Sequence, residues 1–245
     1  MQLFLIALAF SVLGSFGSLF LASALLALPA SSRKRLVPWL VSYAVGTLLG
    51  VALLDLMPEV LDDLSARATF ATLLVGIIAF FVLEKLVLWR HCHTTDCEVH
   101  GRPAGLVLIG HGFHSFVDGA LIAASVHISV PLGLSMAIAV ASHEIPQQVG
   151  DFAILLHAGY SRARALSLSI LSAAGAVVGT SVAFVAFSHI PHVLPFALGI
   201  AAASFLYIAM SDLIPDLHSG RIDAGAFRQL LLVAAGIATA LAVRH

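Results

Sequence analysis

Long apolar segments separated by short polar ones make up most of the chain. Residues 1–32 carry no charged side chain, and further apolar segments cover roughly 36–57, 68–89, 104–127, 132–157, 163–188, 192–214 and 226–243. A helix needs about 20 mostly apolar residues to cross the hydrocarbon core of a bilayer. The pattern therefore predicts an all-α integral membrane protein, with eight transmembrane helices in one domain spanning residues 1–245.

The composition supports this prediction and excludes several classes of soluble protein. Of the 245 residues, 60% are hydrophobic and only 10% are charged, and the mean hydropathy is +1.04. A soluble domain normally has about 25% charged residues. The chain therefore lacks the polar surface of a soluble enzyme or a nucleic-acid binder, and its expected surroundings are the lipid bilayer. The net charge of −1 favours no particular partner.

The basic residues predict an orientation, because Lys and Arg accumulate on the cytoplasmic side of membrane proteins. With both termini on the non-cytoplasmic side, the inner loops hold ten of the twelve basic residues: Arg33, Lys34, Arg35, Lys85, Arg90, Arg102, Arg162, Arg164, Arg221 and Arg228. The opposite orientation would place only two of the twelve inside. A short chain without a large outer domain also favours the inner membrane of a bacterium.

A motif occurs twice, near the ends of two predicted spans. Asp55-Leu-Met-Pro-Glu59 in the second span resembles Asp212-Leu-Ile-Pro-Asp216 in the seventh. These spans run in opposite directions, as expected for an inverted-topology transporter repeat. Spans 1–3 and 6–8 are thus predicted to form two inverted three-helix units around spans 4 and 5. Asp55 and Glu59 would lie at the outer mouth of a cation route, and Asp212 and Asp216 at the inner mouth.

Two motifs near the middle of the fourth and fifth spans carry the residue types of a metal site. The fourth span places these side chains on one helix face: His111, His114 and Asp118. The fifth does the same with His143, Gln147 and Asp151, and Glu144 lies beside them. Each helix thus offers a pair of ligands four residues apart. Two imidazoles, a carboxylate and one more oxygen suit Zn²⁺.

At these residues the sequence resembles the ZIP (Zrt/Irt-like protein) family of divalent metal transporters. The histidine-rich branch of that family carries H-N-x-x-D-G in the fourth span and H-E-x-P-H-E-x-G-D in the fifth. Here the motifs read HSFVDG from His114 and HEIPQQVGD from His143. The resemblance implies transport of divalent metal ions toward the cytoplasm, with zinc as the first candidate cargo and Fe²⁺, Mn²⁺ and Cd²⁺ as others. It also implies a homodimer.

The resemblance also implies which residues hold the ion. The principal transport site would consist of His114, Asp118, His143 and Gln147. A second, adjoining site in some members would use Ser115, Asp118, Glu144, Gln147 and a carboxylate from the sixth span. This chain departs from the family pattern there, because the sixth span has no acid. In addition, Ser115, Gln147 and Gln148 replace Asn, His and Glu.

The loop predicted between the third and fourth spans, at about residues 90–103, is rich in thiols and imidazoles. Its candidate zinc ligands are His91, Cys92, His93, Cys97 and His100. Such a tract could hold a zinc ion or pass it on in the cytoplasm. The alternative is a solvated loop whose composition happens to be rich in His, because short Cys/His tracts are only compositional indications.

Two other functions use the same central residues. An intramembrane zinc hydrolase would read His143-Glu144-Ile-Pro-Gln147 as an approximate H-E-x-x-H motif, with Glu144 as the base. Gln147 in place of the second His and the helix-breaking Pro146 count against this interpretation. A metal sensor that does not transport would use the same ligands as a transporter, so the sequence leaves that alternative open.

Overall fold

The computed structural model describes residues 1–89, 104–217 and 224–244, and within these ranges the chain is helical with short turns and contains no strand. The candidate loop site lies outside the described residues, so it stays a prediction. It comprises His91, Cys92, His93, Cys97 and His100.

The amino-terminal half begins with three helical rods. They are α1 (Gln2–Ala27), a second rod of α2 (Ala30–Gly50), η1 (Val51–Leu56) and α3 (Met57–Asp63), and α4 (Ala66–Trp89). Two long helices follow, α5 (Ala104–Ile128) and α6 (Val130–His157). Ser129 caps α6, because its side chain accepts a hydrogen bond from the backbone N–H of Leu132.

The carboxy-terminal half repeats the pattern of three rods. It contains α7 (Arg162–His189), then η2 (Pro191–Val193), α8 (Leu194–Ile208), η3 (Ala209–Leu213) and α9 (Ile214–Leu217), and finally α10 (Ala224–Arg244). The helix bounds lie within a few residues of those predicted from the apolar pattern for the last five segments. The chain breaks between α7 and α8 at Pro191, in the gap between the predicted segments 163–188 and 192–214.

Six helical segments of the described chain are long and apolar enough to cross a membrane: Gln2–Ala27, Ala30–Asp63, Ala66–Leu83, Arg162–His189, Pro191–Leu213 and Gly225–Val243. This confirms the prediction of an all-α membrane protein. Helices α5 and α6 are not among them, although they are 25 and 28 residues long. These two helices carry the polar motifs, and the arrangement of eight spans stays a prediction.

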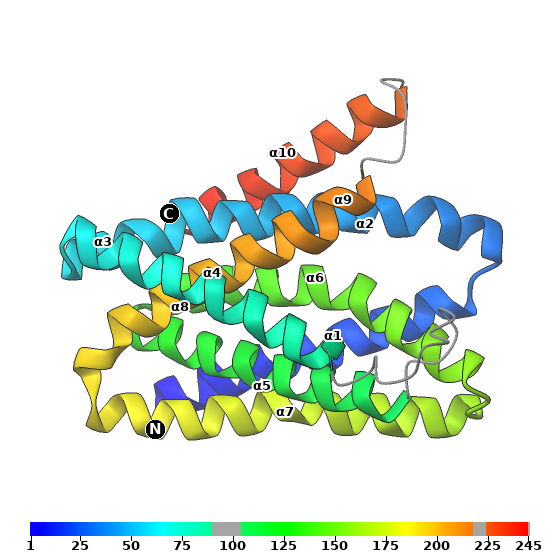
Figure 1. The fold of residues 1–245 in the computed structure, drawn as a ribbon, viewed down its shortest axis with the longest axis horizontal. Coiled ribbons are helices and arrows are strands. Elements are labelled where there is room, and N and C mark those ends of the chain that lie inside the picture. Colours follow the sequence, from blue (N-terminus) through cyan, green and yellow to red (C-terminus); the bar gives the residue numbers. More distant parts are fainter. Residues whose placement is uncertain (90–103, 218–223, 245) are drawn as a thin grey trace.

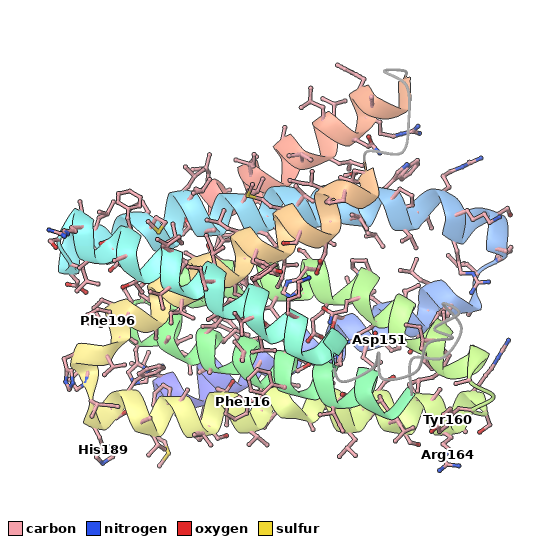
Figure 2. All side chains as sticks on the ribbon, in the orientation of Figure 1. Phe116, Asp151, Tyr160, Arg164, His189 and Phe196 are labelled. Carbon is pink, nitrogen blue, oxygen red and sulfur yellow. The ribbon has the colours of Figure 1, made fainter. Side chains whose placement is uncertain are left out.

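The ends of the helices divide the molecule into two poles. Figure 1 shows both termini at the left end of the bundle, together with the α3–α4 and α7–α8 turns. The α1–α2 and α6–α7 turns lie at the right end. In Figure 2, Arg164 and Tyr160 lie at this right end, while His189 and Phe196 lie at the left. We call the right end the basic end, because α2 begins there with Arg33, Lys34 and Arg35.

Helices α5 and α6 occupy the middle of the bundle and pack against each other. Helix α5 also packs on α7, and α6 packs on α1. Close packing of α5 on α7 depends on glycine, since a Cβ atom at Gly119 would collide with the backbone carbonyl of Ala176. Small residues at helix contacts let two backbones approach closely. The polar motifs on α5 and α6 are thereby held side by side.

Candidate metal centre

Three side chains from the two central motifs converge on one point. His114 and Asp118 come from α5 and His143 comes from α6, and their ligand atoms all lie within 4.8 Å of one another. The Nε2 atoms of the two imidazoles are 3.1 Å apart. Each of these Nε2 atoms lies 3.4 Å from Oδ2 of Asp118. The structure thus brings together three of the residues that the sequence predicted for a metal site.

The size of this triangle suits a tetrahedral zinc ion. Zn²⁺ binds imidazole nitrogen and carboxylate oxygen at about 2.0–2.2 Å, which separates neighbouring ligand atoms of a tetrahedron by about 3.3–3.6 Å. The three observed separations are 3.1, 3.4 and 3.4 Å. The three atoms therefore already have the spacing of one tetrahedral face, and a fourth ligand would approach from the opposite side.

The groups around the ligand triangle also favour the binding of a cation. The Nδ1–H of His143 donates a hydrogen bond to the carbonyl of Ala139 at 2.9 Å, which fixes the ring and turns Nε2 toward the site. Both carboxylate oxygens of Asp118 are buried without a hydrogen-bond donor. A buried carboxylate needs a partner, and the triangle has room for a cation to be that partner.

An open cavity reaches this triangle from the basic end. Its volume is about 560 Å³, and it is lined by residues from α2, α4, α5, α6, α8 and η3, among them Val37, Leu83, Gly110, Gln147, Tyr207 and Asp212. His114 and His143 form part of the wall, and the side chain of His114 is 20% exposed. An ion of the size of Zn²⁺ can therefore reach the ligand atoms from this side.

Packed apolar side chains close the other side of the triangle. The ring of Phe205 lies edge-on to His143, with the ring centroids 5.8 Å apart, and is fully buried. Beyond it the helices form the main hydrophobic core, which includes Leu56, Ile122, Met136 and Leu198. The site is therefore open toward the basic end and sealed toward the end that holds the termini.

The remaining residues predicted for the central sites divide into two groups. Gln147 lines the cavity beside the triangle, where its side-chain oxygen is a candidate fourth ligand. Ser115 and Glu144 are fully buried and bonded to each other, with the hydroxyl of Ser115 donating to Oε1 of Glu144 at 3.0 Å. Glu144 is not in the group of described acids and histidines whose atoms lie close enough to share one ion.

The four acids predicted at the two mouths differ in exposure. Asp212 is exposed and lines the cavity. Asp55 is buried, with 1% of its surface exposed, and Glu59 is partly buried. Asp216 lies in α9, next to the cavity-lining segment. The predicted outer mouth is therefore closed in this structure.

Sequence reasoning missed two polar contacts next to the site. Nδ1 of His111 lies 2.8 Å from Oδ2 of Asp151, so these two polar residues of the central motifs form a pair. Figure 2 shows Asp151 on the basic side of the bundle centre. The second missed contact joins Glu144 to Gln148 and to Ser18 of α1. Ser18 lies on α1, far from α6 along the chain, and no pattern in the sequence indicated this contact.

Comparison with known proteins links the chain to one family. A family model described as ZIP Zinc transporter matches residues 90–244. The chain is 33% identical to zinc transporter ZIP13 of Pongo abelii over 213 residues, covering 81% of this chain and 64% of the relative. It is 32% identical to zinc transporter YKE4 of Saccharomyces cerevisiae over 215 residues, covering 75% and 62%.

A third relative carries a broader description. Metal cation symporter ZIP14 of Xenopus tropicalis is 38% identical over 147 residues, which cover 58% of this chain and 31% of the relative. The chain spans less than two thirds of the length of each of these three relatives. All three come from eukaryotes.

Proposed function

Because the chain belongs to the ZIP zinc transporter family, we propose that it carries divalent metal ions, zinc first among them, across a membrane. The observation that carries the proposal is the triangle of His114, Asp118 and His143 at the inner end of an open cavity. Gln147 supplies a fourth oxygen from the cavity wall. Fe²⁺, Mn²⁺ and Cd²⁺ remain candidate cargo, since the ligand set of two imidazoles and a carboxylate also suits them.

Transport requires ligands that hold an ion firmly enough to select it and loosely enough to release it. Asp118 is the only charged member of the ligand triangle. Neutral imidazoles and an amide complete the set without thiolates, which would bind zinc too tightly for rapid release. The half-open cavity gives the released ion a path past Asp212, whose carboxylate favours a cation in the channel.

We infer that transport runs toward the cytoplasm. The cavity opens at the end where the basic residues gather, and this end faces the cytoplasm by the positive-inside rule. Both termini then lie on the non-cytoplasmic side. We infer that this conformation releases its cargo inward, and that uptake requires a second conformation that opens past Asp55 and Glu59.

Eight spans in two inverted units agree with the way the helices pack. An inverted repeat would exchange α1, α2 and α4 with α7, α8 and α10, and α5 with α6. Under this exchange the contact of α2 with α10 corresponds to the contact of α8 with α4, and both contacts are present. The contact of α5 with α7 likewise becomes that of α6 with α1. A pseudo-twofold axis in the membrane plane relates inverted repeats in this way.

The hydrolase alternative receives no support from the relatives, whose names describe transporters. The site also lacks the parts that a hydrolase needs. Gln147 stands where H-E-x-x-H has its second His, and hydrogen bonds from Ser115 and Gln148 occupy Glu144, which would have to act as the base. A homodimer and a bacterial inner membrane remain predictions.

The test is uptake of radiolabelled zinc into liposomes that contain the purified protein. We expect Asp118→Asn and His143→Ala each to lower the initial rate by at least about tenfold, because even partners outside the ligand shell change metal affinity 10–100-fold. His189→Ala is the matched control, since His189 is exposed at the far end of α7. Wild-type rates in both site variants would refute the assignment. Efficient zinc binding by the wild type without any uptake would favour a sensor.

A further inference from the structure

Two fully buried acids, Asp118 of α5 and Glu144 of α6, lie close together, and their hydrogen-bond partners differ. Asp118 has no hydrogen-bond donor on either oxygen and faces the two imidazoles. Glu144 has a donor on each oxygen, because Oε1 accepts from Ser115 at 3.0 Å and Oε2 accepts from Gln148 at 2.6 Å. Oε2 of Glu144 also accepts from Ser18, so both of its lone pairs are used, whereas both oxygens of Asp118 are open to a cation.

The contact between Gln148 and Glu144 belongs to a network that reaches α1. Nε2 of Gln148 lies 3.2 Å from Oγ of Ser18 and 3.4 Å from the carbonyl of Ser15. The hydroxyl of Ser18 lies 3.0 Å from Oε2 of Glu144. All of these side chains are buried.

We propose that Glu144 is a positioning residue that fastens α6 to α1, and that the Gln148 amide occupies the place from which a second cation would bind this carboxylate. The transport site then takes one ion rather than two. Gln148 becomes the residue that determines the number of ions. This inference rests on the proposed function, because it divides the two buried acids between cargo binding and helix positioning.

The conservative variant Glu144→Gln tests the assignment of Glu144. Oε1 of Gln148 is buried and lacks a partner, so its amide can turn over and accept a hydrogen bond from the new amide at position 144. The anchor survives this change, whereas an ion ligand would lose its charge. We therefore expect Glu144→Gln to bind as many zinc ions as the wild type, with a Kd within about threefold. The matched variant Asp118→Asn loses one zinc ion.

Binding is measured on purified protein by calorimetry and by metal analysis after gel filtration. Each count is taken relative to the wild type, so that zinc bound elsewhere on the chain cancels. Loss of one zinc ion in Glu144→Gln, as in Asp118→Asn, would overturn the proposal, because Glu144 would then be a ligand.

Gln148→Glu tests the role of the amide. This variant places a second carboxylate beside Glu144 and removes the amide donor of Gln148. The number of bound zinc ions should therefore rise by one per chain. Gln148→Leu, the matched control, also removes the donor but adds no charge, and its count should not rise. A count for Gln148→Glu equal to that of the wild type would contradict the role given to Gln148.

A metal-free measurement separates this inference from the proposed function. Ser18→Ala should lower the midpoint of thermal unfolding in the wild type, and by a smaller amount in a Glu144→Ala background, where only the contacts of Ser18 with Ser15 and Gln148 remain to be lost. The control is Ser11→Ala, since Ser11 lies on the same helix but pairs with Thr180 of α7, so its effect should add to that of Glu144→Ala. Additive effects of Ser18→Ala and Glu144→Ala would refute the anchor. If Asp118→Asn binds zinc like the wild type, the transport site fails while the anchor result still stands.

Discussion

The two copies of the Asp-Leu-x-Pro motif have the same local structure and opposite surroundings. Asp55 lies in η1, and Asp212 lies in η3, and in each copy a π-helical segment passes into a short α-helix that begins just before the proline. Asp55 is nevertheless buried beside a core leucine, Leu56, whereas Asp212 is exposed on the wall of the cavity.

The shared part of this comparison has a local cause. Proline has no N–H, so Pro58 and Pro215 cannot donate to the carbonyl four residues earlier, and the helix adjusts to a wider turn before each proline. The difference has a tertiary cause, since only the basic end of the bundle is open. A transporter built from inverted repeats would exchange the two environments when it changes conformation. The motif therefore determines the bend, and the conformation determines which acid is exposed.

The largest expected effect is a contrast in cysteine labelling between equivalent positions. Ile208 precedes Asp212 as Val51 precedes Asp55, but Ile208 lines the cavity and Val51 is 1% exposed. In a Cys92→Ser, Cys97→Ser background, a water-soluble maleimide should modify Ile208→Cys about a hundredfold faster than Val51→Cys, because a packed region must open before it reacts. Equal rates would show that the two ends do not differ.

Glycine substitutions on α5 should sharpen the contrast between its closed and open parts. Gly119 packs against the backbone of α7, whereas a Cβ atom at Gly110 would meet no atom within 4 Å. We expect Gly119→Ala to destabilise the fold by about 1–3 kcal/mol, as overpacking does, and Gly110→Ala to leave it nearly unchanged. Thermal unfolding of the purified variants measures both. Similar stability of the two variants would contradict the close α5–α7 contact.

The smallest effect is expected for the acid in the cavity wall. Asp212→Asn removes a negative charge from the path of the ion without touching the ligand triangle, so zinc uptake should fall by about threefold and depend less on ionic strength. Ser211→Ala is the control, because Ser211 is exposed but does not line the cavity. A loss as large as that of Asp118→Asn would instead make Asp212 a ligand.

The sequence predicted the helices and the ligand triangle because both depend on regular spacing. Apolar runs gave the helix positions, and the spacing of four residues between His114 and Asp118 placed them on one face of α5. The sequence could not predict contacts between distant helices. The bond from Ser18 to Glu144 and the pair formed by His111 and Asp151 depend on how α1, α5 and α6 pack.

The exposure of each acid was also beyond the sequence. Asp55 and Asp212 occur in nearly the same five residues, so no local pattern distinguishes the buried acid from the exposed one. Glu144 and Asp118 likewise both looked like ligands at mid-span. Their surroundings separate them, since Ser115, Ser18 and Gln148 donate to Glu144, whereas Asp118 faces the two imidazoles. These differences arise from packing and conformation, which composition and periodicity do not encode.

X-ray absorption at the zinc edge is the most direct test of the central claim, that His114, Asp118 and His143 hold the transported ion. It is recorded on zinc-loaded protein in the Cys92→Ser, Cys97→Ser background, which has no other cysteine. The claim predicts two imidazoles and further oxygen ligands at about 2.0–2.2 Å, with one imidazole lost in His143→Ala. A first shell of oxygen alone, or a spectrum unchanged in His143→Ala, would contradict it.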